Sequence, residues 1–119
     1  MATGRLGAQT LKANNVAQSI YRANTENMTI ASVSIVNKRN DDVEVSLAIT
    51  ATENAISSLE YIEHKVILKP KCVLERTGIA VSKGQYITAS SDLDRVDVVA
   101  WGMCSGDVDA DIDQTITVA

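Results

Sequence analysis

The sequence alternates apolar and polar residues with a period of two in a series of short segments, each ended by turn-forming residues. The clearest segment is residues 43–50, where Val43, Val45, Leu47 and Ile49 fall on one side and the intervening residues on the other. Successive side chains of a β-strand point to opposite faces, so this pattern predicts a half-buried strand rather than a helix. The chain should therefore fold into β-sheets.

Other segments predict strands in the same way, separated by polar stretches or by stretches that contain Pro or Gly. Residues 51–60 break the alternation and predict a surface loop or one short helical turn. We expect hairpins around the turns at 37–42, 82–84 and 91–94. Seven or eight short strands without a long helix indicate an all-β fold, an antiparallel β-sandwich or jelly roll with extended N- and C-terminal arms. The expected strands are residues 16–22, 28–36, 43–50, 61–68, 72–77 (followed, after a bend at Gly78, by 79–81), 85–90 and 95–103.

Length and composition limit the possible classes of protein. A chain of 119 residues has room for one domain with one apolar core. Because there is no Phe, the core must consist mainly of Val, Ile, Leu and Ala. The net charge of −4 argues against nucleic acid as a partner. No apolar run is long enough to span a membrane and no signal-peptide core is present, so we expect no membrane association and synthesis in a cytoplasm.

The charges are distributed unevenly along the chain. Residues 1–22 contain three bases and no carboxylate, whereas residues 105–119 contain four aspartates and no base. These differences suggest three parts: a basic N-terminal arm at 1–15, a β-sandwich domain at 16–104 and an acidic C-terminal arm at 105–119. The two arms should attract each other because their charges are opposite.

The acidic arm also has a strand-like pattern. From residue 107 to 118 its odd positions are all Asp or Thr and its even positions are mostly aliphatic. Such alternation matters only where one face is buried, so we expect the arm to dock as a strand. Binding between arms of different copies would give a ring or another oligomer. The candidate interface residues are Arg5, Lys12, Arg22, Asp107, Val108, Asp109, Asp111, Ile112, Asp113, Ile116 and Val118.

Catalysis is not expected from this sequence. His64 is the only histidine, and it belongs to a predicted strand whose neighbours Glu63 and Lys65 point to the other face. The sequence has no nucleophile elbow, glycine-rich phosphate loop or cluster of metal ligands. We expect no enzyme activity, no cofactor and no small-molecule substrate.

A calcium loop is the one metal site that the aspartates resemble. Asp107, Asp109 and Asp111 match the first three ligand positions of an EF-hand. The match then fails, because Ile112 stands where the turn requires Gly and Val118 stands where the loop requires Glu. We therefore expect no metal site.

The two cysteines, Cys72 and Cys104, are too few for a disulfide scaffold and lack the spacing of a zinc site. The sequence leaves three alternatives open: buried thiols, an intrachain disulfide, or a link between subunits that forms in oxidising surroundings. We treat both cysteines as possible redox residues.

Several short motifs resemble a group of small virion structural proteins of tailed bacteriophages, including myoviruses of cyanobacteria. The resemblance covers residues 4–103. Two features depart from that pattern: residues 22–27 replace a Pro-Ala-Gly-Lys turn, and the group has no comparable aspartate arm. The shared motifs are Gly4-Arg5-Leu6-Gly7, Ile20-Tyr21-Arg22-Ala23, Val33-Ser34-Ile35-Val36-Asn37-Lys38, Glu60-Tyr61-Ile62-Glu63, Val73-Leu74-Glu75-Arg76-Thr77-Gly78-Ile79 and Val99-Ala100-Trp101-Gly102.

The resemblance implies a β-sandwich that coats or joins parts of a phage particle, made in the host bacterial cytoplasm and present in the virion. It implies no catalytic residues. Its partners would be copies of itself and other virion proteins of the neck, tail or capsid. Opposite-signed arms favour a ring at the neck, collar or tail. The alternatives are a capsid decoration protein and a receptor- or carbohydrate-binding sandwich at a fibre tip.

Overall fold

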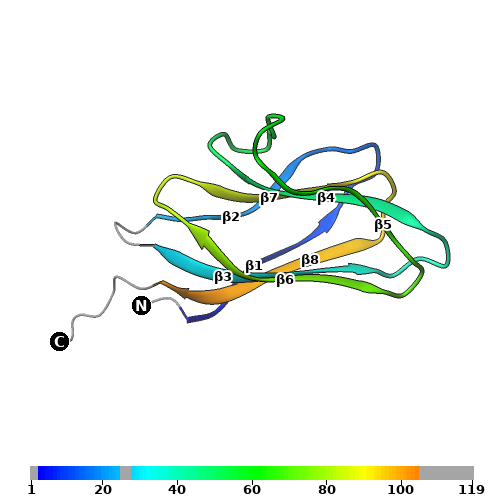
Figure 1. The fold of residues 1–119 in the computed structure, drawn as a ribbon. Helices are drawn as coiled ribbons and strands as arrows, with labels where there is room; N and C mark the ends of the chain where they lie inside the picture. Colours follow the sequence, from blue (N-terminus) through cyan, green and yellow to red (C-terminus); the bar gives the residue numbers. More distant parts are fainter. Residues whose placement is uncertain (1–2, 25–27, 105–119) are drawn as a thin grey trace, which may run out of the picture.

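The computed structural model describes residues 3–24 and 28–104, and these residues form an all-β sandwich without a helix (Figure 1). The prediction of an all-β fold is therefore confirmed. Of the predicted strands, 43–50 and 61–68 have the observed bounds. The eight strands are β1 (Thr3–Leu11), β2 (Gln18–Arg22), β3 (Thr29–Asn37), β4 (Val43–Thr50), β5 (Tyr61–Leu68), β6 (Val73–Val81), β7 (Tyr86–Ser91) and β8 (Val96–Cys104).

The strands form two four-stranded sheets that face each other as two layers (Figure 1). The first sheet, sheet A, has the order β1-β8-β3-β6, and the second, sheet B, has the order β2-β7-β4-β5. Every neighbouring pair is antiparallel. Consecutive strands lie in different sheets except β4 and β5. This order is that of a jelly roll, in which the chain passes from one layer to the other at almost every turn.

This topology corrects the predicted hairpins. The turns at 37–42, 82–84 and 91–94 connect β3 to β4, β6 to β7 and β7 to β8, and in each case the two strands belong to different sheets. Alternation in a strand indicates that one of its faces is buried. The same face is buried whether the chain then turns back within the sheet as a hairpin or crosses over to the other sheet. The sequence pattern could not distinguish the two connections.

The N-terminal segment also differs from the prediction. Residues 1–15 were expected to form an arm outside the sandwich, but Thr3–Leu11 pair with β8 from Thr3 opposite Met103 to Leu11 opposite Val96. Leu11 is buried in the core. A β-bulge between Arg5 and Gly7 breaks the period of two, which explains why the strand was not recognised.

The core lies between the inner faces of the two sheets and consists mainly of aliphatic side chains. The predicted inner face of β4 is confirmed, since Val43, Val45 and Leu47 are almost completely buried. The outer face of β4 is buried as well at Ala48 and Thr50, so this strand is not half-buried as predicted. Other fully buried core residues are Val33, Ile35, Val81, Ile87, Ala89, Val96, Val98 and Ala100.

The 51–60 segment forms a loop without a helix and is held against sheet B. The backbone N–H of Ser19 in β2 donates to the Asn54 side chain at 2.8 Å, and the Asn54 backbone N–H donates to the Ser19 hydroxyl at 2.9 Å. Beneath it, the Thr88 hydroxyl lies 2.9 Å from those of Ser19 and Thr50. This loop therefore helps to explain the burial of the outer face of β4.

A substitution at Gly102 tests how closely β8 packs against β3. A Cβ atom at this position would lie 2.1 Å from the carbonyl oxygen of Ile30, so the two strands would have to separate. We expect Gly102→Ala to lower the free energy of unfolding by about 3 kcal/mol. The control is Gly84→Ala, where no atom lies within 4 Å and only the positive φ of 86° opposes the change, at a cost of about 1 kcal/mol. Urea unfolding measures both values, and equal losses would contradict the packing.

Candidate assembly surfaces

The three predicted basic interface residues are exposed but do not form one site. Arg5 lies in β1 of sheet A, opposite Trp101 of β8. Lys12 directly follows β1, and Arg22 ends β2 of sheet B. The Arg22 guanidinium lies 5.9 Å from the centre of the Tyr86 ring, where a cation–π interaction is favourable. The charge asymmetry seen in the sequence is therefore spread over two sheets.

The predicted interface residues of the acidic arm, four aspartates and four aliphatic residues, lie outside the described residues. Their predicted docking as a strand and their pairing with the basic residues stay predictions. They are Asp107, Val108, Asp109, Asp111, Ile112, Asp113, Ile116 and Val118.

The strand register excludes one of the three alternatives for the cysteines. Cys104 is opposite Thr29 in β3, whereas Cys72 directly precedes Val73, which is opposite Val36. Seven residues of β3 separate these positions, which corresponds to about 23 Å. A disulfide requires Cα atoms less than about 7 Å apart. An intrachain Cys72–Cys104 bond is therefore excluded. The alternative of a buried thiol is wrong for Cys72, which is exposed, so its thiol is accessible to another molecule.

The outer face of sheet A carries exposed apolar side chains. Ile30 and Met103 are opposite each other on β3 and β8 and are 41% and 51% exposed. Val73 on β6 is 53% exposed. On the same face of β8, Val99 and Trp101 lie between Asp97 and Met103 and are half-buried. We call this surface the apolar face; it consists of Ile30, Val73, Val99, Trp101 and Met103.

A shallow depression of about 350 Å³ borders the apolar face between β1 and β8. Arg5 lies at one end and Thr10 and Asp97 at the other, with Ala8 and Val99 between them. Arg5 is opposite Trp101 and Asp97 is opposite Thr10, so the two charges are separated along the strands and do not neutralise each other. The depression is open and mixed in polarity, which is typical of a contact surface rather than of an enclosed ligand site.

Asp97 connects three strands at this surface. Its carboxylate accepts a hydrogen bond from the Thr10 hydroxyl at 2.8 Å and lies 2.9 Å from the Lys38 ammonium. Desolvation by burial raises the pKa of Asp97, but the hydrogen bonds from Lys38 and Thr10 and the charge of Lys38 outweigh it, so the pKa is lower than usual. The carboxylate is therefore ionised at neutral pH and ties β8 to β1 and to the end of β3.

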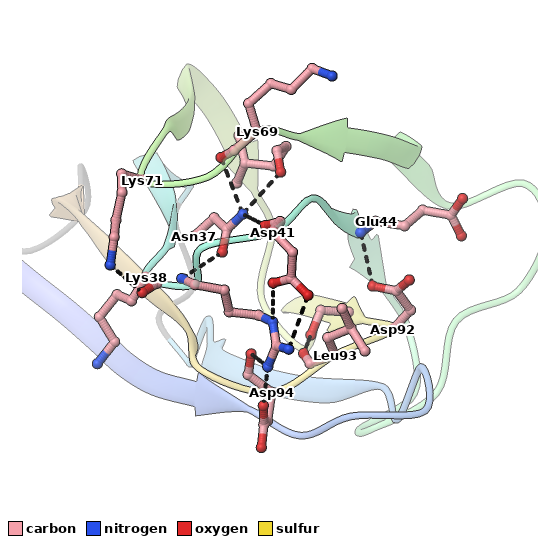
Figure 2. A network of polar contacts seen from close by, with 12 residues as sticks. Asn37, Lys38, Asp41, Glu44, Lys69, Lys71, Asp92, Leu93 and Asp94 are labelled. Carbon is pink, nitrogen blue, oxygen red and sulfur yellow. Dashed lines mark hydrogen bonds and ion pairs between the residues drawn. The ribbon is translucent and has the colours of Figure 1, made fainter.

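A buried asparagine joins the loops at this end of the sandwich (Figure 2). Asn37 ends β3, is fully buried and accepts the backbone N–H of Arg39 at 2.9 Å. Because a side-chain amide has only two hydrogens, its three acceptors must share them. The acceptors are the backbone carbonyls of Asp41, Leu68 and Lys69, at 2.9, 3.0 and 3.1 Å.

Two further contacts extend this network to the β7–β8 loop (Figure 2). Arg39 forms ion pairs with Asp41 and Asp94, and the hydrogen bond with Asp41 is the main reason why the pKa of Arg39 is raised and that of Asp41 lowered. Asp92 accepts the backbone N–H of Glu44 at 2.8 Å. Three crossover loops are thus fixed to one another, which makes this end of the molecule a rigid platform.

The loop over sheet B presents a leucine to solvent. The Glu60 carboxylate accepts backbone N–H groups of Ser57 and Ala51, both at 2.9 Å, and these bonds lower the pKa of Glu60. Leu59, within the loop closed by these bonds, is 96% exposed. Sequence reasoning did not identify this residue, although an isolated leucine in a polar loop could have been noticed.

His64 lies in β5 as predicted, with an exposed side chain and its ring 4.3 Å from that of Tyr61. Among the described residues, no group of three His, Cys, Asp or Glu side chains could hold a metal ion. In the same part of the chain, no helix is long and apolar enough to cross a membrane.

Comparison with known proteins gives no relative. No protein-family model, curated protein sequence or solved structure matches this chain.

The contribution of Asn37 to stability can be tested by comparison with Asn40, a neighbouring asparagine. We expect Asn37→Ala to lower the free energy of unfolding by about 2–3 kcal/mol, because it leaves buried backbone carbonyls without donors. Asn40 lies in the same loop but is exposed, so Asn40→Ala should change stability by less than about 0.5 kcal/mol. Chemical denaturation of the two variants checks this, and a loss below 1 kcal/mol for Asn37→Ala would show that the network does not stabilise the loops.

The lowered pKa of Asp97 predicts that the stability of the fold depends on pH. Because its folded-state pKa lies below the unfolded value of 3.8, the ionised carboxylate stabilises the fold above about pH 4, and this contribution is lost as the pH falls through the folded-state pKa. We expect Asp97→Asn to cost about 1 kcal/mol at pH 7 and almost nothing at pH 2. Denaturant unfolding at both pH values measures this. The control is Asp42→Asn, since the Asp42–Lys69 ion pair is solvent-exposed; an equal pH dependence in both variants would contradict the assignment.

Proposed function

We propose that this chain is a structural virion protein of a tailed bacteriophage that assembles in multiple copies at the neck, collar or tail. The observation that carries the proposal is the apolar face. Ile30, Val73 and Met103 expose large apolar side chains on the outer face of sheet A. Ile30 and Met103 are neighbours, whereas Val73 is opposite Val36, six residues along β3 from Ile30. Apolar side chains exposed on one face in this way are typical of protein contact sites. The partner that covers it in this proposal is another copy of the chain.

Three further features support an assembly role. The crossover loops are fixed by the Asn37 network, which suits a rigid building block. The jelly-roll order occurs in viral capsid proteins, although it also occurs in lectins and cupins and does not by itself define a function. The short motifs that resemble virion structural proteins lie mainly in β1, β3, β6 and β8, which form sheet A.

A carbohydrate-binding role receives less support from the described residues. Sugar sites commonly use exposed aromatic rings, but the aromatic side chains here are all partly buried and lie on four different strands. They are Tyr21, Tyr61, Tyr86 and Trp101. A capsid decoration protein would use the same surfaces as a neck protein, so the two locations require a different experiment.

Self-association in solution tests the assembly role. We expect the full chain to sediment as an oligomer and a chain ending at residue 104 to stay folded and all-β but to associate more weakly, because the acidic arm adds contacts to those of the apolar face. Raising the salt concentration from about 50 mM to 500 mM should weaken the oligomer, since exposed ionic contacts are screened. Analytical ultracentrifugation with circular dichroism measures size and fold. A full chain that stays monomeric at every concentration would contradict multi-copy assembly.

The location in a particle is tested separately by counting copies. A number set by a six-fold or twelve-fold axis supports the neck or tail, whereas hundreds of copies per particle would contradict it and support decoration of the capsid. A reconstruction of the particle in which density for this chain is located gives the count directly.

A further inference from the structure

The sandwich has four edge strands that differ in their ability to accept another strand. The edges of sheet A are β1 and β6, and those of sheet B are β2 and β5. An edge strand has a row of backbone N–H and C=O groups without strand partners, so it can bind an extended segment of another chain. Proteins usually obstruct such edges with bulges, side chains or neighbouring loops.

Three of the four edges are obstructed. At β1, Gly7 is so close to β2 that a Cβ would lie 2.3 Å from the Ile20 carbonyl oxygen, and farther along the Gln18 side chain accepts the Lys12 backbone N–H and donates to the Thr10 carbonyl. At β2, the Ser19 backbone N–H already donates to the Asn54 side chain. In β5, Lys65 has a φ of +53° and the pairing with β4 shifts register twice, which bends the strand.

The remaining edge is the first half of β6, residues 73–77. These residues pair with β3 in continuous register from Val73 to Arg76, before the irregularity near Gly78. All except Leu74 are exposed. The Arg76 guanidinium forms an ion pair with Glu63 of β5 across the gap between the sheets, but this contact uses side chains only. Within the described residues, β3 is the one strand that pairs with β6.

We propose that the open edge of β6 binds the alternating segment 107–118 of a second copy as an added strand of sheet A. This inference rests on the proposed multi-copy assembly and identifies the surface that receives the acidic arm. The segment has the period of two that a strand requires and is at least as long as β6. Its pattern therefore suits the free edge, and it is long enough to cover all of residues 73–77.

Charge also favours this edge. The segment 61–81, which contains β5 and β6, carries four bases and two carboxylates, whereas residues 105–119 carry four aspartates. An acidic strand beside β6 is thus attracted to its surroundings, and this attraction would steer association at low salt. The four bases are Lys65, Lys69, Lys71 and Arg76.

The geometry favours a second copy over the chain's own arm. Since β8 is followed by β3 and then β6 in sheet A, a strand added outside β6 lies three strand spacings from β8, or about 14 Å. From Cys104 to Asp107 the chain spans at most about 11 Å. Asp107 of the chain's own arm cannot therefore pair along β6, so that arm can offer only its later residues, whereas the arm of another copy can present all of 107–118.

Hydrogen–deuterium exchange on the full chain tests the proposal. With rising protein concentration, the amides of residues 73–77 should exchange about tenfold more slowly or better, and those of β1 should not change. The double variant Ile112→Pro/Ile116→Pro should abolish this protection because proline cannot pair within a strand. The matched control is Ile112→Val/Ile116→Val, which keeps strand propensity and should keep the protection.

A variant of the receiving edge gives an independent test. Thr77→Glu, at an exposed position of the same edge outside the apolar face, places a carboxylate next to the acidic arm and should weaken association about tenfold, because like charges on adjacent strands repel. Val16 is similarly exposed but lies in the β1–β2 loop, so Val16→Glu should leave association unchanged. Equal effects of the two substitutions would overturn the assignment of β6.

The outcomes separate this inference from the proposed function. If the chain associates but residues 73–77 gain no protection, the β6 site is wrong while multi-copy assembly stands. If protection is lost in the proline variant but does not depend on concentration, the chain's own arm occupies the edge and the second copy is excluded. If the chain is monomeric and β6 is unprotected, both proposals fail.

Discussion

The packing of two aliphatic sheet faces against each other is the interaction on which the rest of this structure depends. Val33 and Val98 of sheet A and Val45 and Leu47 of sheet B are almost completely buried between the layers. Burial of each such side chain contributes about 1.5–3 kcal/mol. Neither sheet can bury its inner face alone, so the two must form together. In a jelly roll, the chain meets this requirement by changing layer at nearly every turn.

That requirement explains where the polar residues are placed. A crossover loop breaks the strand ladder and leaves backbone carbonyls near the core without donors. Asn37 supplies donors to carbonyls of two different loops, and Asp92 accepts a backbone N–H from β4. The Arg39 ion pairs then hold the same loops from the solvent side. The polar network at this end of the sandwich is therefore part of the fold and not evidence of a catalytic site.

The sequence predicted the strands better than their pairing. β4 and β5 were predicted with their observed bounds because their alternation is unbroken, whereas β1 was taken for an arm because its bulge at Arg5 and Gly7 hides the period. The layer of each strand was not predictable, since a hairpin and a crossover bury the same residues. Asn37 was missed because a buried amide that bonds to backbone carbonyls has no sequence signature.

Only part of the candidate assembly surfaces could be predicted from the sequence. The exposure of Arg5, Lys12 and Arg22 follows from their charge, but their separation over two sheets depends on the topology. The sequence could not predict the apolar face in full, because an alternating pattern does not show that Ile30 is exposed whereas Ile35 is buried. The intrachain disulfide could be excluded only once the register along β3 was known.

An added strand at β6 would connect the two proposed contact surfaces. Within β6, Arg76 is opposite the buried Val33, whereas Val73 belongs to the exposed apolar face. A strand that directs its aspartates toward the Arg76 side places them near the bases of β5 and β6, and its aliphatic residues then lie beside Val73. Sheet A would gain a fifth strand and a wider apolar face. Docking of one arm would thereby enlarge the surface available to the next copy, which favours growth of an assembly over an isolated dimer.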